Sequence, residues 1–223
     1  MTTRHFQQGY PIWPITLPSA IACDPNGALP ASRLAPIGHG GRLEATKAAP
    51  AWSALWVAAQ SEGFDLTWTP AGDYRSLETQ ERGFYSRTRP IPTPDGNQYR
   101  DRFYAGGWYE DIPGTAQVAT PGTSNHGNAL AIDTALGRSP AEALHIGTVA
   151  PNGRTALSWL RAPAPAEWQP SGPGGALCNA ETFGFCWEPA PAGRAVEPWH
   201  LNYYAGDATP ARVTAVLAFV GAA

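Results

Sequence analysis

The chain has 223 residues, of which 43% are hydrophobic and 15% are charged, and its formal net charge is −3. This composition supports a packed core and excludes a largely disordered chain. Lysine and arginine do not cluster anywhere, which argues against nucleic acid as a partner, because phosphate binding needs such clusters.

The N-terminal segment, MTTRHFQQGYPIWPITLPSAIACDP, contains no apolar stretch of signal-peptide length. Nowhere do 18 consecutive apolar residues occur, so neither a membrane-spanning helix nor a membrane partner is expected. We therefore expect synthesis in the cytoplasm without a signal peptide. Residues 1–41 are rich in proline and glycine, which predicts an irregular N-terminal arm on the surface.

The first predicted helix covers about residues 50–61, because Trp52, Leu55, Trp56 and Ala59 recur at i, i+3, i+4 and i+7. The following FDLTWTP alternates between hydrophobic and polar residues, as a short strand does.

A second helix is predicted to open near Ser76. The segment 88–123 that follows shows little periodicity over a length that is unusual for a loop inside a compact domain. Its many aromatic residues suit the wall or lid of a groove. The alternative is a covering loop that is packed by its own aromatic rings.

The S-x-x-E pattern at Ser139–Glu142 predicts a capped helix that runs to about His145. Another helix is predicted within GRTALSWLRA. The last helix should be capped by Thr209 and begin at Pro210, with a buried face made of Val213, Val216, Leu217 and Val220. Because no repeat and no linker divides the chain, a single domain spanning 1–223 is expected.

The three cysteines are Cys23, Cys178 and Cys186, an odd number without C-x-x-C spacing, so no cysteine zinc site is expected. Cys178 and Cys186 could form a disulfide, but free buried thiols are the favoured interpretation. Three histidines are interpreted as structural or surface residues: His5, His39 and His145.

The stretch SNHGNALAID combines polar and apolar residues in a way that suits a metal site. ALAID reads as a buried strand, because Leu130 and Ile132 alternate with smaller residues. Asp133 then falls near the strand end, where a carboxylate can enter a cleft. His126 precedes the strand behind a short turn, so the two side chains can meet as ligands of a divalent cation.

A third ligand is available in EPWHLNY, where His200 follows Glu197 by three residues. Hydrolytic zinc sites usually have three protein ligands and one position for water. A carboxylate beside the ion can take the proton of that water. The alternative for each histidine is a hydrogen-bonded residue of the core.

SNHGNALAID and EPWH resemble the S-x-H-x-x-G-x-A-x-D and E-x-W-H signatures of the VanX/VanY-type zinc D-Ala-D-Ala peptidases. These enzymes belong to the LAS group, which also contains lysostaphin-type enzymes and hedgehog domains. DYRSLETQ is similar to the Y-R-S-x-x-x-Q segment of the VanY-type branch, and PGTSNHG to cell-wall peptidases of actinobacteria and their phages. The resemblance covers about Phe64 to Tyr204.

The chain departs from the pattern at Ala129, where the family has glycine. An alanine methyl group is tolerated there if the backbone has ordinary strand angles, but it causes strain if φ is positive.

The resemblance implies one Zn²⁺ ion held by His126, Asp133 and His200. It implies that Glu197 is the catalytic base and that Arg75 stabilises the oxyanion and the substrate carboxylate.

The same resemblance implies that Ser124 and Gln80 form hydrogen bonds with the substrate peptide; local capping of a turn and a helix is the alternative. Trp187, Tyr203 and Tyr204 line the groove or belong to the core.

The fold implied by the resemblance is α+β: a small, mainly antiparallel sheet that bears the zinc site, surrounded by helices. The implied activity is zinc-dependent hydrolysis of a peptidoglycan stem peptide, by an L-alanyl-D-glutamate endopeptidase or a D-Ala-D-Ala carboxypeptidase. A phage-type endolysin, released through a holin-type pore, is the favoured interpretation. The alternatives are a cytoplasmic D-Ala-D-Ala dipeptidase and a non-catalytic, zinc-stabilised peptidoglycan-binding module, although the latter has no need of Glu197.

Overall fold

A computed structural model of the chain describes residues 3–38, 40–64, 66–96, 101–134, 155–170, 175–190 and 194–221. The helix predicted from Ser139, with His145, lies outside these residues, as does His39. The strands are β1 (His5–Gln7), β2 (Tyr10–Ile12), β3 (Leu34–Pro36), β4 (Arg42–Glu44), β5 (Thr88–Ile91), β6 (Arg102–Tyr104), β7 (Gly107–Asp111), β8 (Ala131–Asp133), β9 (Phe185–Trp187) and β10 (His200–Tyr203). The α-helices are α1 (Ala48–Ser61), α2 (Leu77–Arg87), α4 (Ala156–Arg161), α5 (Asn179–Thr182) and α6 (Ala211–Gly221), and the 3-10 helices are η1 (Ser19–Ile21), η2 (Ala31–Arg33), η3 (Asn125–Asn128) and η4 (Ala166–Trp168).

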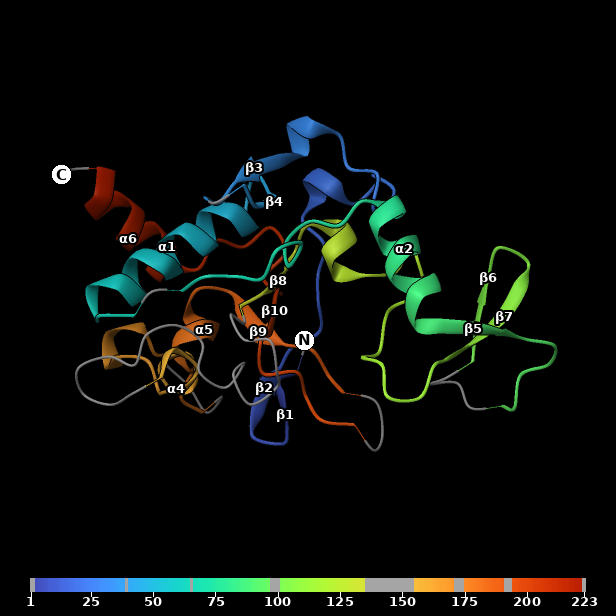
Figure 1. The fold of residues 1–223 in the computed structure, drawn as a ribbon. Coiled ribbons are helices and arrows are strands. Elements are labelled where there is room, and N and C mark those ends of the chain that lie inside the picture. The colour runs from blue at the N-terminus through green and yellow to red at the C-terminus, as the bar shows by residue number, and fades with distance from the viewer. Residues whose placement is uncertain are drawn as a thin grey trace.

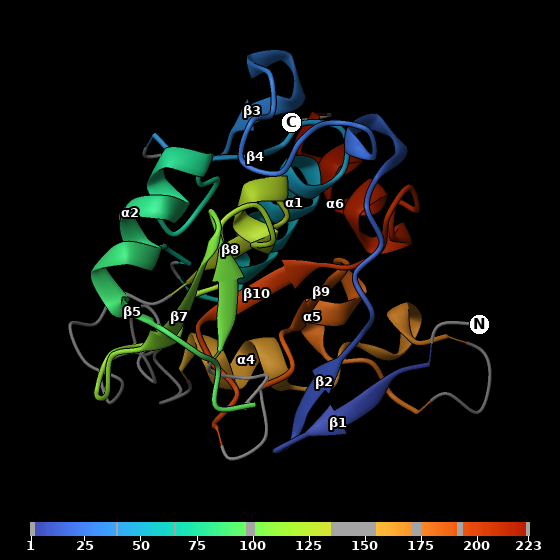
Figure 2. The same cartoon turned by 90° about the vertical axis from the view of Figure 1, so that its right-hand side faces the viewer.

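A five-stranded sheet in the order β1-β2-β9-β10-β8 occupies the middle of the molecule (Figure 1). Its pairs are antiparallel except for β2 with β9. Figure 2 shows α2 on one side of this sheet and α6 on the other, with α1 behind it. The expected mixture of a small, mainly antiparallel sheet and a few surrounding helices is therefore present.

The two faces of the sheet differ in character. Leu201 and Tyr203 of β10 and Phe185 of β9 are fully buried, and Phe185 lies 6.0 Å from the ring of Trp52 on α1. Because side chains alternate along a strand, His200 lies on the opposite face. Core packing on one face thus fixes β10, and the other face of this strand carries His200.

Helix α1 has the expected buried stripe: Trp52, Leu55 and Ala59 are buried and Trp56 is half-buried. In α6 only part of the predicted face is covered, because Val213 is buried whereas Val220 is 46% exposed. Val220 is in the last turn of the helix and is exposed, so the prediction was wrong there.

Residues 1–41, expected to be an irregular arm, contribute two strands to the main sheet. β1 and β2 form a hairpin in which Gln7 pairs with Tyr10. The two residues between them, Gln8 and Gly9, both have positive φ (51° and 77°), as the tight turns that join twisted strands require. Ile12 then pairs with Trp187 of β9, which joins the N-terminal segment to the centre of the sheet.

The segment 88–123, expected to be a long loop, contains the three-stranded sheet β5-β7-β6. This sheet lies beyond α2, away from the five-stranded sheet (Figure 1). Ala105 and Gly106 make the β6–β7 turn with positive φ (48° and 82°), and a buried ion pair joins Arg102 to Asp111. Tyr109 packs against Phe84 of α2 with 5.1 Å between ring centroids, so aromatic packing holds the sheet to the helix.

The strand predicted at FDLTWTP is absent from the described residues of that segment. Residues 69–72 make a turn beside β8 instead. Two backbone hydrogen bonds join this turn to the strand, from Thr69 N to Asp133 O (3.0 Å) and from Asp133 N to Gly72 O. The predicted start of α2 is confirmed, since Ser76 Oγ accepts from Thr79 N. The helix predicted in GRTALSWLRA is also confirmed as α4, capped by Thr155.

Cys178 and Cys186 are both buried and free, which confirms the thiol interpretation, and Cys23 is exposed. Trp187 and Tyr203 are fully buried in the core. Among the described residues no helix is long and apolar enough to cross a membrane.

Candidate metal centre

The register of β8 and β10 places His200 directly opposite Asp133. Directly opposed residues on neighbouring strands have their Cβ atoms about 5 Å apart, so their side chains meet. His200 Nδ1 lies 3.0 Å from Asp133 Oδ1. Thr134 extends this pairing, because its N–H and hydroxyl both donate to the carbonyl oxygen of Trp199 at 2.8 and 2.9 Å.

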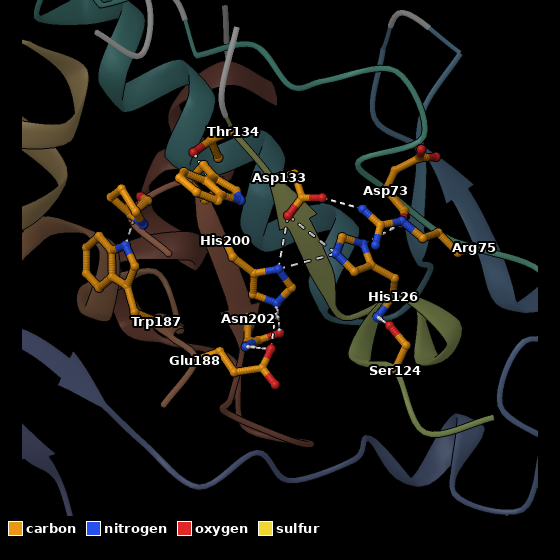
Figure 3. Close-up of polar contacts among 12 residues, drawn as sticks. Asp73, Arg75, Ser124, His126, Asp133, Thr134, Trp187, Glu188, His200 and Asn202 are labelled. Atoms are coloured by element: carbon orange, nitrogen blue, oxygen red, sulfur yellow. Dashed lines mark hydrogen bonds and ion pairs between the residues drawn. The ribbon is translucent and has the colours of Figure 1, made fainter. Parts of the chain in front are cut away.

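His126 reaches the same point from η3, the short helix that precedes β8. Its Nδ1 lies 2.8 Å from the carbonyl oxygen of Asp73. A carbonyl can only accept, so this contact requires the proton on Nδ1 and leaves the lone pair of Nε2 free. Nε2 points toward Asp133 and His200 (Figure 3).

Three ligand atoms therefore form a small triangle. His126 Nε2 lies 3.4 Å from both Asp133 Oδ1 and His200 Nδ1, and the third side is 3.0 Å. Ligands bound to tetrahedral zinc at about 2.0–2.1 Å are separated by about 3.3 Å. Two imidazole nitrogens with one carboxylate oxygen suit zinc or a similar transition metal better than magnesium or calcium, which prefer oxygen ligands alone. The residues present thus fit a single ion of zinc or a similar transition metal.

The turn between His126 and β8 is strained at Ala129. This residue has φ 55° and ψ 31°, the left-handed region that favours glycine. Its N–H donates to His126 O at 3.1 Å and its carbonyl accepts from Glu44 N at 2.8 Å. The alanine is therefore accommodated with positive φ, where the family pattern has glycine, and not with strand angles.

Arg75 contacts the second carboxylate oxygen of Asp133, Oδ2, whereas the two histidines lie near Oδ1 (Figure 3). Its Nη2 donates to Asp133 Oδ2, its Nε donates to Ala71 O at 2.8 Å, and its backbone N–H donates to His126 O at 3.0 Å. Asp133 is thus held at one oxygen by the guanidinium and offers the other to the histidines.

The charges of the cluster shift the pKa values of its members. Burial lowers the pKa of His126. Burial opposes ionisation of Asp133, but the adjacent His126 and His200 hold its pKa well below the usual range. For His200, burial acts downward, but hydrogen bonds with Asp133 and Glu188 outweigh it and raise the pKa well above the ordinary value. A bound cation would replace the proton on each imidazole nitrogen that faces it, because metal ligation requires neutral imidazole.

Glu197 lies in the turn that leads into β10, where His200 N donates to Glu197 O at 3.2 Å. Burial raises the pKa of the Glu197 carboxyl, and the negative charges of Asp133 and Glu188 add to the shift. Among the described residues nothing forms a hydrogen bond with this carboxylate. It is therefore near the cluster and available to a substrate or water.

The two predicted substrate-binding residues differ in their surroundings. Ser124 caps η3, its Oγ accepts from His126 N at 3.3 Å, and its hydroxyl proton remains available. The amide of Gln80 is buried and bonded to the protein, because Nε2 donates to Asn26 Oδ1 and Arg75 O and Oε1 accepts from Gly122 N. Gln80 thus connects α2 to the segments that carry the site.

Two residues beside His200 were missed in the sequence. Glu188 Oε2 lies 2.8 Å from His200 Nε2, and Asn202 Oδ1 lies 3.1 Å from the same nitrogen. The hydrogen bond with His200 outweighs burial and lowers the pKa of Glu188 to about 2. The available signals were weak: Asn202 follows His200 by two positions on one strand, and Glu188 directly follows a buried strand.

No family model matches the chain, and no curated protein matches it. Comparison with solved structures finds "VanYB in complex with D-Alanine-D-Alanine", which is 18% identical. The match covers 93% of this chain and 91% of that one, with a TM-score of 0.44. At this similarity the residues of the site, and not the neighbour, carry the functional conclusion.

Proposed function

We propose that the chain is a zinc-dependent peptidase that hydrolyses a bond in peptidoglycan stem peptides. The observation that carries the proposal is the triangle of His126 Nε2, Asp133 Oδ1 and His200 Nδ1, with sides of 3.0–3.4 Å. The sequence motifs around these residues, which resemble those of VanX/VanY-type peptidases, supply the substrate class.

The proposed chemistry assigns one task to each polar group. When bound, a zinc ion would act as a Lewis acid and lower the pKa of a bound water to about 7. Glu197 accepts the proton of the attacking water and delivers it to the leaving amine nitrogen. Among the described residues no hydrogen bond engages the Glu197 carboxylate, so it is free to accept and return this proton.

In this proposal Arg75 stabilises negative charge on the substrate. Among the described residues no hydrogen bond engages its Nη1, whereas Nη2 and Nε hold Asp133 and Ala71. A guanidinium fixed at two nitrogens can donate from the third to an oxyanion or a carboxylate without reorganising. Ser124 can donate its hydroxyl proton to a carbonyl of the bound peptide.

The experiment that tests the proposal is a mass-spectrometric digest of purified peptidoglycan, run beside free D-Ala-D-Ala. The native protein, chelator-treated protein and the Glu197→Gln variant are compared. Stem peptides that begin at D-Glu identify an L-alanyl-D-glutamate endopeptidase, as expected for a phage-type endolysin. Loss of a terminal D-Ala identifies a carboxypeptidase, and cleavage of D-Ala-D-Ala alone identifies a dipeptidase. If zinc-loaded protein changes neither substrate, the catalytic proposal is wrong and the centre is structural or serves binding.

A further inference from the structure

Glu188, Asp133 and His200 form one row across three neighbouring strands. Leu201 pairs with Trp187 and Asn202 pairs with Cys186, so the next position of the same register sets Glu188 opposite His200. The pairing of β8 with β10 sets Asp133 opposite His200 from the other side. His200 is therefore flanked by a carboxylate on each side, and each carboxylate meets a different ring nitrogen.

The two carboxylates have different relations to the proposed metal position. Asp133 Oδ1 lies near Nδ1, the nitrogen that faces His126, whereas Glu188 Oε2 lies 2.8 Å from Nε2 (Figure 3). The two nitrogens of an imidazole point away from each other. Glu188 Oε2 is thus on the far side of the ring and is not a ligand of the same ion.

We propose that Glu188 is a positioning residue, which holds the proton of His200 on Nε2 and so presents the Nδ1 lone pair to the metal. This inference rests on the proposed metal centre. A carboxylate is an acceptor only, so the 2.8 Å contact with Glu188 requires a proton on Nε2. The proton that the contact with Asp133 requires on Nδ1 is the one that a metal ion would replace. Histidine ligands of metals commonly donate their second N–H to a carboxylate, which fixes the tautomer and the orientation of the ring.

Neighbouring contacts hold Glu188 at this point. Asn202 Nδ2 donates to Glu188 Oε2 at 3.4 Å, while its Oδ1 lies 3.1 Å from His200 Nε2. The preceding Trp187 is fully buried, and its Nε1 donates to Pro198 O at 3.0 Å. The end of β9 therefore holds the turn before His200 through Trp187 and the imidazole itself through Glu188.

The side chain of Glu188 is 48% exposed, so its replacement leaves the core packing unchanged. Glu188→Ala removes both the charge and the acceptor, whereas Glu188→Gln keeps a carbonyl acceptor at about the same place. Glu78→Gln is the matched control, because Glu78 is 82% exposed and forms an ion pair with Arg82 on the surface of α2.

The test measures the affinity of each metal-free protein for Co²⁺ and Zn²⁺, by the absorption bands of bound Co²⁺ and by competition with a chelator. We expect Glu188→Ala to weaken binding by about 10- to 100-fold, the range found when such partners of metal ligands are removed. Glu188→Gln should restore most of the affinity, and Glu78→Gln should equal the native protein. In zinc-loaded native protein, the His200 Nε2–H signal in a long-range ¹H–¹⁵N spectrum should exchange slowly with water, and in Glu188→Ala it should exchange faster.

If Glu188→Ala binds both ions within twofold of the native protein, Asn202 alone orients His200 and the inference is overturned. It is also overturned if Glu188→Gln is as weak as Glu188→Ala, because the acceptor would then not be the feature that matters. These results differ from failure of the proposed function, in which the native protein itself would bind no metal or would bind it without hydrolysing peptides.

Discussion

His200 Nδ1 lies 3.0 Å from Asp133 Oδ1 because the two residues are directly opposed on β10 and β8. Strand pairing therefore brings together two residues that are separated by 67 positions in the sequence. The third group, His126, is oriented by the contact of its Nδ1 with Asp73 O, which is 53 positions away in the sequence. The centre thus depends on a rigid sheet for two ligands and on a tautomer-fixing contact for the third.

Replacing His126 with alanine should abolish stoichiometric metal binding. The native chain should bind one zinc ion and should unfold at a higher temperature with zinc than with chelator, because a ligand that binds only the folded state stabilises it. At free zinc 100 times the dissociation constant, this gain is about 2.7 kcal/mol. His126→Ala should show no such gain, measured by thermal unfolding and by metal analysis. His5→Ala, at an exposed position, is the control and should behave as the native protein.

Replacing Glu197 with glutamine should separate catalysis from metal binding. The variant keeps the shape of the side chain but cannot accept the proton of water, so turnover should fall by about 10²- to 10⁴-fold. Zinc content should be unchanged, because Glu197 is not one of the three groups that form the ligand cluster. Turnover is measured by release of stem peptides. A loss of zinc together with activity would show that Glu197 acts as a ligand and not as a base.

The sequence predicted elements that depend on local signals. The cap of α2 at Ser76 and the buried stripe of α1 with Trp52 and Leu55 were readable, because capping and helical periodicity involve residues close in the chain. Both missed hairpins have glycine at the second turn position, after Gln8 and after Ala105. The usual signal for such a turn is Asn-Gly or Asp-Gly, so these turns gave no clear indication of strands.

In the candidate site, too, features with a local sequence signal were predicted and features that depend on strand pairing were not. The motifs identified the residues that the structure brings together at the triangle, but the contact of Glu188 with His200 depends on the β9–β10 register, which no local pattern contains. Gln80 fits the family motif by spacing, yet its amide is bonded within the protein. Spacing alone cannot show whether a polar side chain faces a groove or the backbone of a neighbouring loop.

In the native protein only one thiol should react rapidly with a disulfide reagent at pH 8. Cys23 is exposed, whereas Cys178 and Cys186 are buried. Burial raises the pKa of both buried thiols, that of Cys186 to about 12, so the reactive thiolate form appears only at strongly alkaline pH. One thiol per chain should therefore be counted in the folded state and three after denaturation. Cys23→Ser should lower the folded count to zero; fast reaction of that variant would place a second thiol at the surface.

We propose that the exposed aromatic residues of the segment 88–123 bind the cell-wall polymer, and Trp108 should contribute to this binding. Trp108 and Phe103 are cross-strand neighbours with 5.3 Å between ring centroids, and Phe103 is 56% exposed. Tyr109 points to the other face and packs on Phe84, so its ring has a structural role. Trp108→Ala should reduce co-sedimentation with isolated cell walls without loss of zinc, and Tyr109→Phe should not. Equal binding by Trp108→Ala and native protein would rule out this role.

Glycine at Ala129 should be far less destabilising than glycine at Ala131, although both alanines are fully buried. Each change removes a buried methyl group, at a cost of about 0.8 kcal/mol, and adds about 0.5–1 kcal/mol of backbone entropy in the unfolded state. At Ala129 these costs are offset, because glycine relieves about 1–2 kcal/mol of left-handed strain at φ 55°. Ala129→Gly should therefore stay within about 1 kcal/mol of the native free energy of unfolding, while Ala131→Gly, in a regular strand, should lose about 1.5 kcal/mol. Urea unfolding in chelator measures both without the contribution of metal, and equal losses would show that the Ala129 backbone stores no strain.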